Sequence, residues 1–304
     1  MPPQKSGAGG CKPPSYFADP PLRYRIEYAL YRLFAGLMHL LPIETASAVS
    51  GRLWRWLAPY SKRHRRVVRH LKIAYPEKSE SERQEIAAAS WDTMGRVFAE
   101  SFRLNEILAS DRVRLENFDT VQARLSACNG FVACSAHQGN WEIAVAPLTM
   151  MGIRTAGIYR RLKNPYVDEM VRQQRNALYP DGLFQKQHST ALTATRYLKN
   201  GGALSIMADL RERRGPSVPF FGHPAPSNAF PAMLAVTLDK PVFVAQVMRE
   251  ENVRFTIRLE EIDVVRTGDR EADIIATTAR IQAALERNIR ARPGEWMWAH
   301  GRWT

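Results

Sequence analysis

One short segment of the chain carries side chains suited to acid–base chemistry. Residues 135–142 read Ser-Ala-His-Gln-Gly-Asn-Trp-Glu and follow an apolar run that we expect to be a buried strand. The imidazole of His137 could take the proton of a hydroxyl while that hydroxyl attacks an acyl carbonyl. We expect Glu142 to fold back onto the other ring nitrogen, where a carboxylate fixes the tautomer and stabilises the imidazolium. The alternative is a helix-start histidine followed by a capping glutamate.

The pattern around this segment predicts an α/β fold. From about residue 129, short apolar runs alternate with amphipathic stretches, which favours a mostly parallel central sheet covered by helices. In such sheets ligands bind at the carboxyl ends of the strands, where His137 would lie. We expect strands at 131–136, 155–159, 203–208, 242–247 and 253–259, and helices at 141–151, 165–178, 190–199, 229–238 and 271–290.

The first third of the chain predicts a helical, membrane-associating region. Residues 22–60 are helical in pattern, with breaks at Pro42 and Pro59, and the apolar residues within 26–41 recur at about every 3.6 residues. Arginines and tryptophans near this stripe suit a helix that lies in a bilayer surface, although a core-packing helix has the same pattern. A capping box at 79–82 predicts the start of another helix.

Composition restricts the partners and the domain organisation. The 304 residues include 43 Lys and Arg against 30 Asp and Glu, and the net charge of +13 favours polyanionic partners such as membranes, nucleic acids or acidic proteins. No aromatic-interleaved basic surface is apparent, so nucleic acid is the least expected of these partners. Cys11, Cys128 and Cys134 lack the spacing of a disulfide framework. We expect a mobile tail over 1–21, a helical region over 22–110 and an α/β core over 111–304, with 22–304 forming one folded unit.

The order of motifs along residues 25–303 resembles the glycerolipid acyltransferase superfamily. Within it, the sequence His-Gln-Gly-Asn-Trp-Glu at 137–142 resembles the branch that adds lauroyl- or myristoyl-type secondary acyl chains to lipid A. The other motifs that carry the resemblance are Tyr159-Arg160, Asn164-Pro165, Arg175, Asp209, Val218-Pro219-Phe220-Phe221-Gly222 and the terminal segment from Trp296 to Trp303.

The resemblance implies a role for each polar side chain of these motifs. His137 would be the general base and Glu142 its orienting partner. Arg160 would bind a phosphate of the acceptor or of the donor's phosphopantetheine arm, since a guanidinium fork matches phosphate geometry. Asp209 would position either Arg160 or the acceptor hydroxyl. Tyr159 and Arg175 would belong to the same substrate-binding set.

The aromatic block of the family pattern is expected to form a wall of the acyl site. Phe220 and Phe221 would supply apolar surface, and Gly222 would allow close approach. Core packing explains the two phenylalanines equally well.

The resemblance also implies the reaction and its partners. An acyl chain would pass from acyl carrier protein to a hydroxyl of a lipid A precursor in a ternary complex, at the cytoplasmic face of the bacterial inner membrane. The acceptor would be an anionic membrane lipid, and we expect no cofactor and no metal site. The alternatives are another acceptor lipid such as a phosphatidylinositol mannoside, acyl-CoA as the donor, a hydrolase, or a basic membrane- or nucleic-acid-binding protein without enzymatic activity.

Overall fold

A central sheet of seven strands organises the fold. In the computed structural model, which describes residues 20–116, 118–187 and 189–303, its strands are β1 (Val113–Leu115), β2 (Phe131–Ser135), β3 (Thr155–Tyr159), β4 (Leu183–Gln185), β5 (Ala203–Met207), β8 (Val242–Arg249) and β9 (Phe255–Ile262). Their order is β1-β9-β8-β2-β5-β3-β4, and all neighbouring pairs are parallel except β8 with β9. The predicted mostly parallel sheet is therefore confirmed.

The sequence pattern located the long strands and missed the short ones. Each of the five predicted strands is present, and no end differs by more than three residues. The missed strands β1 and β4 have three residues each, too few to show a hydrophobic pattern. An antiparallel hairpin of β6 (Ser217–Phe220) and β7 (His223–Pro226) was also missed.

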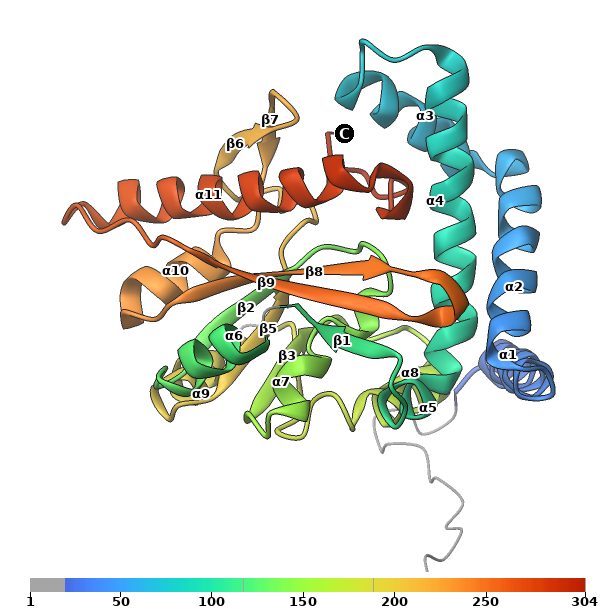
Figure 1. Cartoon of the computed structure of the whole chain (residues 1–304), viewed down its shortest axis with the longest axis horizontal. Coiled ribbons are helices and arrows are strands. Elements are labelled where there is room, and N and C mark those ends of the chain that lie inside the picture. Colours follow the sequence, from blue (N-terminus) through green and yellow to red (C-terminus); the bar gives the residue numbers. More distant parts are fainter. Residues whose placement is uncertain (1–19, 117, 188, 304) are drawn as a thin grey trace, which may run out of the picture.

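Helices cover both faces of the sheet (Figure 1). Val132 and Cys134 of β2 point to one face, where they share a core with α9, α10 and α11. Phe131 and Ala133 point to the other face and pack with α5, α6 and α7, as the two-residue period of a strand requires. These helices are α5 (Leu104–Leu108), α6 (Phe118–Ser126), α7 (Ala146–Met150), α9 (Thr190–Lys199), α10 (Phe230–Leu238) and α11 (Arg270–Ala291).

The helix predicted at 141–151 is interrupted. The chain forms a single 3-10 turn, η3 (Trp141–Ile143), and then the short helix α7. Pro147 lies in the first turn of α7, the one place where a proline needs no helical N–H partner. A continuous helix would require that missing N–H, so the prediction of one helix here is wrong.

The N-terminal helices stand at one end of the sheet, where α2 and α4 lie side by side (Figure 1). A Cβ added to Gly95 of α4 would lie 2.5 Å from the Ser50 carbonyl oxygen, so this glycine permits the close approach. The predicted capping box of Ser79 and Glu82 begins α4. The helices of this region are α1 (Leu22–His39), α2 (Ile43–Leu57), α3 (Lys62–Ala74) and α4 (Glu80–Glu100), and α8 (Pro165–Arg175) packs against α1.

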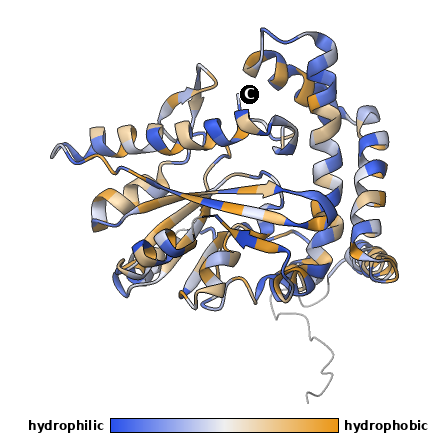
Figure 2. Ribbon diagram, in the orientation of Figure 1, coloured by the Kyte–Doolittle hydropathy of each residue, from blue (hydrophilic) through white to orange (hydrophobic). Residues whose placement is uncertain are grey.

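The apolar stripe of α1 faces outward. Its inner side packs Phe34 and Met38 into a small core with Phe98 and Phe102. Figure 2 shows the apolar residues along this helix, and the large ones on its outer side are exposed. They are Leu22, Ile26, Leu30, Leu33 and Leu37, with Leu40 just beyond the helix end.

No helix in the described part of the chain has the length and hydropathy needed to cross a membrane. The membrane-associating role of residues 22–110 and the proposed domain boundaries stay predictions. The tail expected at 1–21, including Cys11, lies outside the described residues up to position 19.

Candidate active site

His137 and Asp209 are brought together by strand register. In the parallel pair β2 and β5, Ser135 lies opposite Met207. His137 and Asp209 each follow these positions by two residues, so both side chains leave the sheet at the same carboxyl-terminal edge. His137 Nδ1 lies 2.9 Å from Asp209 Oδ1, across 72 residues of sequence.

Asp209 orients the imidazole through several hydrogen bonds. Its Oδ2 accepts hydrogen bonds from the backbone N–H of His137 at 2.9 Å and from Trp296 Nε1 at 2.8 Å. Burial alone would raise the pKa of this carboxyl, which is 1 % exposed, but the charge of His137 and these donors outweigh burial and lower it to about 2. The ionised carboxylate therefore holds the proton on Nδ1 and leaves Nε2 as the basic nitrogen.

Glu142 is not the partner of the imidazole at Nδ1. Its two carboxylate oxygens accept hydrogen bonds from Arg175 Nε and Nη2, at 2.7 and 2.6 Å. The predicted His137–Glu142 contact is wrong because η3 begins directly after Asn140 and directs Glu142 towards α8, whereas strand pairing directs Asp209 to the histidine. Burial would lower the pKa of Arg175, but the charge of Glu142 raises it, so the pair is ionic.

The loop after His137 is hydrogen-bonded to the backbone of α11 and of the segment that follows it. Gln138 Nε2 donates to the Asn288 carbonyl at 2.8 Å, and the Gly139 N–H donates to the Glu295 carbonyl at 3.1 Å. Gly139 has φ of +57°, and a Cβ there would lie 2.4 Å from the Val247 carbonyl oxygen. Only glycine fits this position without displacing backbone.

A buried ion pair supports the other side of this loop. Asn140 Nδ2 donates to Glu100 Oε2 at 2.9 Å, and its Oδ1 caps η3 by accepting from the Glu142 N–H at 3.2 Å. Glu100 is 0 % exposed and accepts a bidentate pair from Arg249, with both distances 2.7 Å. Trp141 places its ring 5.5 Å from the His137 ring. The imidazole is thus fixed by contacts on both sides.

The chemistry open to this arrangement is general-base catalysis on an external group. His137 keeps 17 % of its side chain exposed, and within the described residues no side chain or backbone group is bonded to its Nε2. No serine hydroxyl or cysteine thiol of that part of the chain is hydrogen-bonded to the ring, so the proton that the base removes would belong to a substrate hydroxyl or to water.

Comparison with protein families agrees with this chemistry. The model of the family described as bacterial lipid A biosynthesis acyltransferase matches residues 19–304. The chain belongs to this family. It is therefore an acyltransferase, and the resemblance inferred from its motifs is confirmed. A comparison with curated protein sequences gave no match.

Arg160, the predicted phosphate ligand of this acyltransferase, lies at the same edge of the sheet as His137. β3 pairs with β5, and β5 pairs with β2, so Arg160 follows a strand two positions from that of His137. Two strand spacings correspond to about 10 Å. Arg160 is exposed, whereas Tyr159 before it is half-buried and its pKa is raised by burial.

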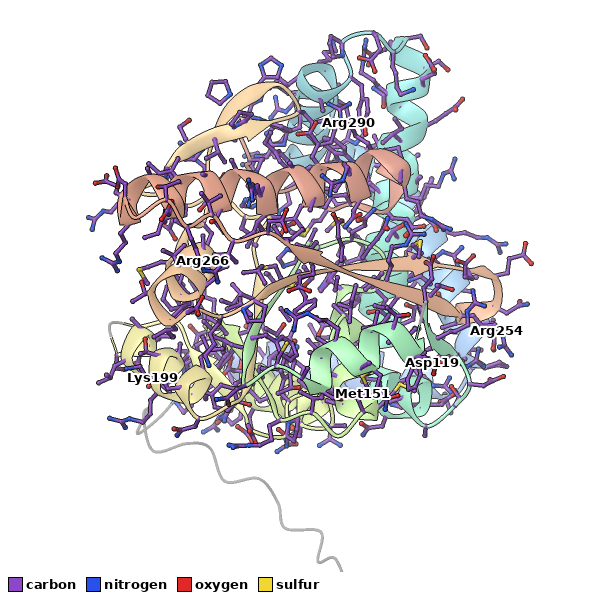
Figure 3. The ribbon with its side chains drawn as sticks, turned by 60° about the vertical axis from the view of Figure 1, so that its left-hand side comes forward. Asp119, Met151, Lys199, Arg254, Arg266 and Arg290 are labelled. Carbon is purple, nitrogen blue, oxygen red and sulfur yellow. The ribbon has the colours of Figure 1, made fainter. Side chains whose placement is uncertain are left out.

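The aromatic block of the acyltransferase is part of the core. Phe220 and Phe221 are 0 % and 4 % exposed, and Phe221 packs against Trp298 and against the guanidinium of Arg290. Arg290, on α11, is labelled in Figure 3. They offer almost no open surface, so their role as a wall of the acyl site stays a prediction. Gly222 is exposed with φ of +74°, and a Cβ there would meet nothing within 4 Å. This left-handed φ favours glycine, and the expected role of Gly222 in close approach to the acyl chain stays a prediction.

The sequence did not predict the roles of two residues that contribute to the site. Trp296 was singled out only as the start of the terminal motif, but it is buried and donates to Asp209. Arg249 gave no signal, since its partner Glu100 lies 149 residues away. Across residues 20–116, 118–187 and 189–303, no group of three His, Cys, Asp or Glu side chains is arranged to hold a metal ion.

Proposed function

We propose that this acyltransferase moves an acyl chain from acyl carrier protein to a hydroxyl of a lipid A precursor, within a ternary complex. The observation that carries the proposal is the buried Asp209 carboxylate on His137 Nδ1, with Nε2 left to a substrate. Family membership supports the acceptor class. The donor is supported by charge, since a protein with a net charge of +13 attracts a small acidic carrier.

The proposed reaction needs one proton to move twice. His137 Nε2 takes the proton of the acceptor hydroxyl while its oxygen attacks the thioester carbon. The carbon–sulfur bond then breaks, and the departing thiolate takes the proton from the imidazolium, which leaves an ester and a free thiol. Asp209 stays ionised throughout and stabilises the imidazolium. Arg160 binds a phosphate of the acceptor or donor at the same edge.

The test is acyl transfer by the purified full-length protein in detergent. Acyl carrier protein thioesters of several chain lengths serve as donors, and a Kdo-bearing tetra-acylated lipid A precursor serves as the acceptor. The expected product is a penta-acylated lipid, with His137→Ala as the inactive control. Release of free fatty acid at the same rate without acceptor would instead identify a hydrolase, and transfer only from acyl-CoA would overturn the proposed donor.

We propose further that α1 lies in the surface of the membrane that holds the acceptor, at the cytoplasmic face of the inner membrane. Leu30 and Leu33 on its outer side are each 61 % exposed, and Arg23 and Arg32 are placed to meet anionic headgroups. On its other side α1 is tied to α8, where Asn164 Nδ2 donates to the Tyr24 carbonyl at 2.9 Å. Arg175, the partner of Glu142, also belongs to α8. A lipid beside α1 would therefore be close to residues 137–142, the catalytic loop.

A double substitution tests this orientation of α1. Leu30→Glu/Leu33→Glu removes apolar area from the outer stripe and adds two charges, so binding to phosphatidylglycerol-containing vesicles in a flotation assay is expected to fall at least about tenfold. Leu192→Glu is the control, because Leu192 is 63 % exposed on the distant helix α9. Equal vesicle binding by the double variant and the wild type would contradict an interfacial α1.

A further inference from the structure

A cavity lies behind the catalytic loop, between α2, α4 and the segment that follows α11. Its volume is about 570 Å³, within the range of small-ligand sites, which is roughly 300–1,000 Å³. Five arginines and two carboxylates, Asp92 and Glu295, line it, so the lining carries three more positive than negative charges. Its five arginines are Arg52, Arg55, Arg96, Arg249 and Arg292.

Two of these arginines lack a protein partner. Arg96 pairs with Asp92, Arg249 with Glu100, and Arg292 with Glu295 and Glu250. For Arg52 and Arg55, no hydrogen bond or ion pair exists within the described residues. Both are exposed on α2, and their spacing of three residues puts them on one side of that helix. The cavity thus presents two unengaged guanidinium groups next to three engaged ones.

The lining selects an anionic group over an apolar one. Alanine, threonine, proline and glycine are the only uncharged residues of the cavity wall, so nothing there would hold an acyl chain. Guanidinium forks bind phosphate oxygens in pairs, and their hydrogen bonds to anions are stronger than those between neutral groups. The Glu295 carboxylate in the wall is paired with Arg292 at 3.1 Å, and burial raises its pKa.

We propose that this cavity binds a phosphate group at Arg52 and Arg55, at a site separate from His137. The phosphate can belong to an acidic phospholipid headgroup or to a soluble phosphate compound. The headgroup is favoured by the neighbouring surface, because Val49, Leu53 and Trp56 of α2 are exposed beside the two arginines. A lipid could rest its chains on that apolar surface while its phosphate enters the cavity.

The cavity also shares a wall with the catalytic loop. The Glu295 carbonyl accepts from the Gly139 N–H at 3.1 Å, and the Glu295 carboxylate would lie 3.3 Å from a Cβ on Gly139. Arg249 reaches the loop through Glu100, which accepts from Asn140. A bound phosphate would therefore stand one layer behind the residues that hold His137.

The experiment compares two charge-matched double variants of the full-length protein. Arg52→Ala/Arg55→Ala removes the proposed ligands, and Arg196→Ala/Lys199→Ala removes the same charge from α9, far from the cavity (Lys199 is labelled in Figure 3). Inorganic pyrophosphate binding is measured by titration calorimetry, and vesicle binding is measured by flotation with phosphatidylcholine alone or with phosphatidylglycerol, at one fixed salt concentration. Arg160→Ala is included to distinguish phosphate binding in the cavity from phosphate binding at the edge of the sheet where His137 lies.

Loss of two charge-assisted contacts is expected to weaken binding at least about tenfold in the Arg52/Arg55 variant. The α9 variant is expected to bind as the wild type does, and Arg160→Ala is expected to retain the binding that the Arg52/Arg55 variant loses. If pyrophosphate binding is lost, the site takes soluble phosphates, and if only phosphatidylglycerol-dependent flotation is lost, it takes a lipid headgroup. Equal binding by both double variants in both assays would overturn the proposal, while the proposal of acyl transfer at His137 would stand.

Discussion

Replacing His137 with Ala, or Asp209 with Asn, is expected to lower kcat/KM for acyl transfer by about a thousandfold or more. The Ala variant has no base. In the Asn variant, the N–H groups of His137 and Trp296 both point at the position of Oδ2 and would keep the amide oxygen there. The amide NH2 then faces Nδ1 and donates to it, which forces the ring proton onto Nε2. The imidazole remains in place but cannot accept the hydroxyl proton.

The two changes are expected to be non-additive. Because both remove the same basic nitrogen, the double variant His137→Ala/Asp209→Asn should be no slower than His137→Ala alone. Initial rates at acceptor concentrations well below KM give kcat/KM for the three variants. Asp111→Asn, which changes an exposed carboxylate in a surface ion pair, is the control. Wild-type rates from Asp209→Asn would show that the imidazole depends on another group, and Glu142 would be tested next.

Replacing Glu100 with Ala is expected to destabilise the protein by about 3–5 kcal/mol, because it leaves Arg249 buried without its counter-charge. Ser47 Oγ donates to Glu100 at 2.6 Å and Asn140 Nδ2 at 2.9 Å, so two further donors lose their acceptor. Acyl transfer should fall as well, since Asn140 belongs to the loop that holds His137. The free energy of unfolding is measured by urea denaturation at pH 7.

The control for Glu100 is a similar but exposed pair. Glu261→Ala breaks an ion pair with Arg124 in which the side chains are 38 % and 46 % exposed, and a loss of about 0–1 kcal/mol is expected. Adding Arg249→Met to Glu100→Ala should recover part of the stability, because the unpaired buried charge is removed. A loss below about 1 kcal/mol for Glu100→Ala would contradict the assigned role of this pair.

The same ion pair predicts the sign of a pH dependence. Burial would raise the pKa of Glu100, but Arg249 and the other donors outweigh it and lower the pKa from 4.5. A carboxyl whose pKa is lower in the folded protein stabilises it fully above the unfolded pKa, and that contribution is lost as the pH falls through the folded value. The difference in stability between wild type and Glu100→Gln should therefore shrink as the pH falls below about 4.5.

Much of the fold was predictable because its signals are local. A capping box, the two-residue period of strands and the 3.6-residue period of helices each depend on residues close in sequence. They gave the start of α4, the five longer strands and the helices α8 to α11 to within a few residues. They failed at β1 and β4, which are too short to show a period, and at 141–151, where Pro147 divides the helix.

The side chains of the candidate site could also be selected from the sequence, but their pairing could not. His137, Asp209, Glu142 and Arg175 were all chosen in advance, and Glu142 was expected to fold back onto the imidazole. The true partner, Asp209, depends on β2 and β5 being neighbours in register, and no local pattern states which strands are adjacent. The pair of Glu100 and Arg249 joins the ends of a helix and a strand 149 residues apart.

The sequence alone determined the element types, the family motifs, the excess of positive charge and the apolar stripe of the first helix. The tertiary structure decided that this stripe faces outward and not into the core, because a membrane-facing helix and a core-packing helix share one periodicity. It also decided which carboxylate holds the imidazole and placed arginines from α2, α4, β8 and the segment after α11 around one cavity. The physical reason is the same in each case: contacts between distant residues follow from strand order and helix packing, which a local pattern does not encode.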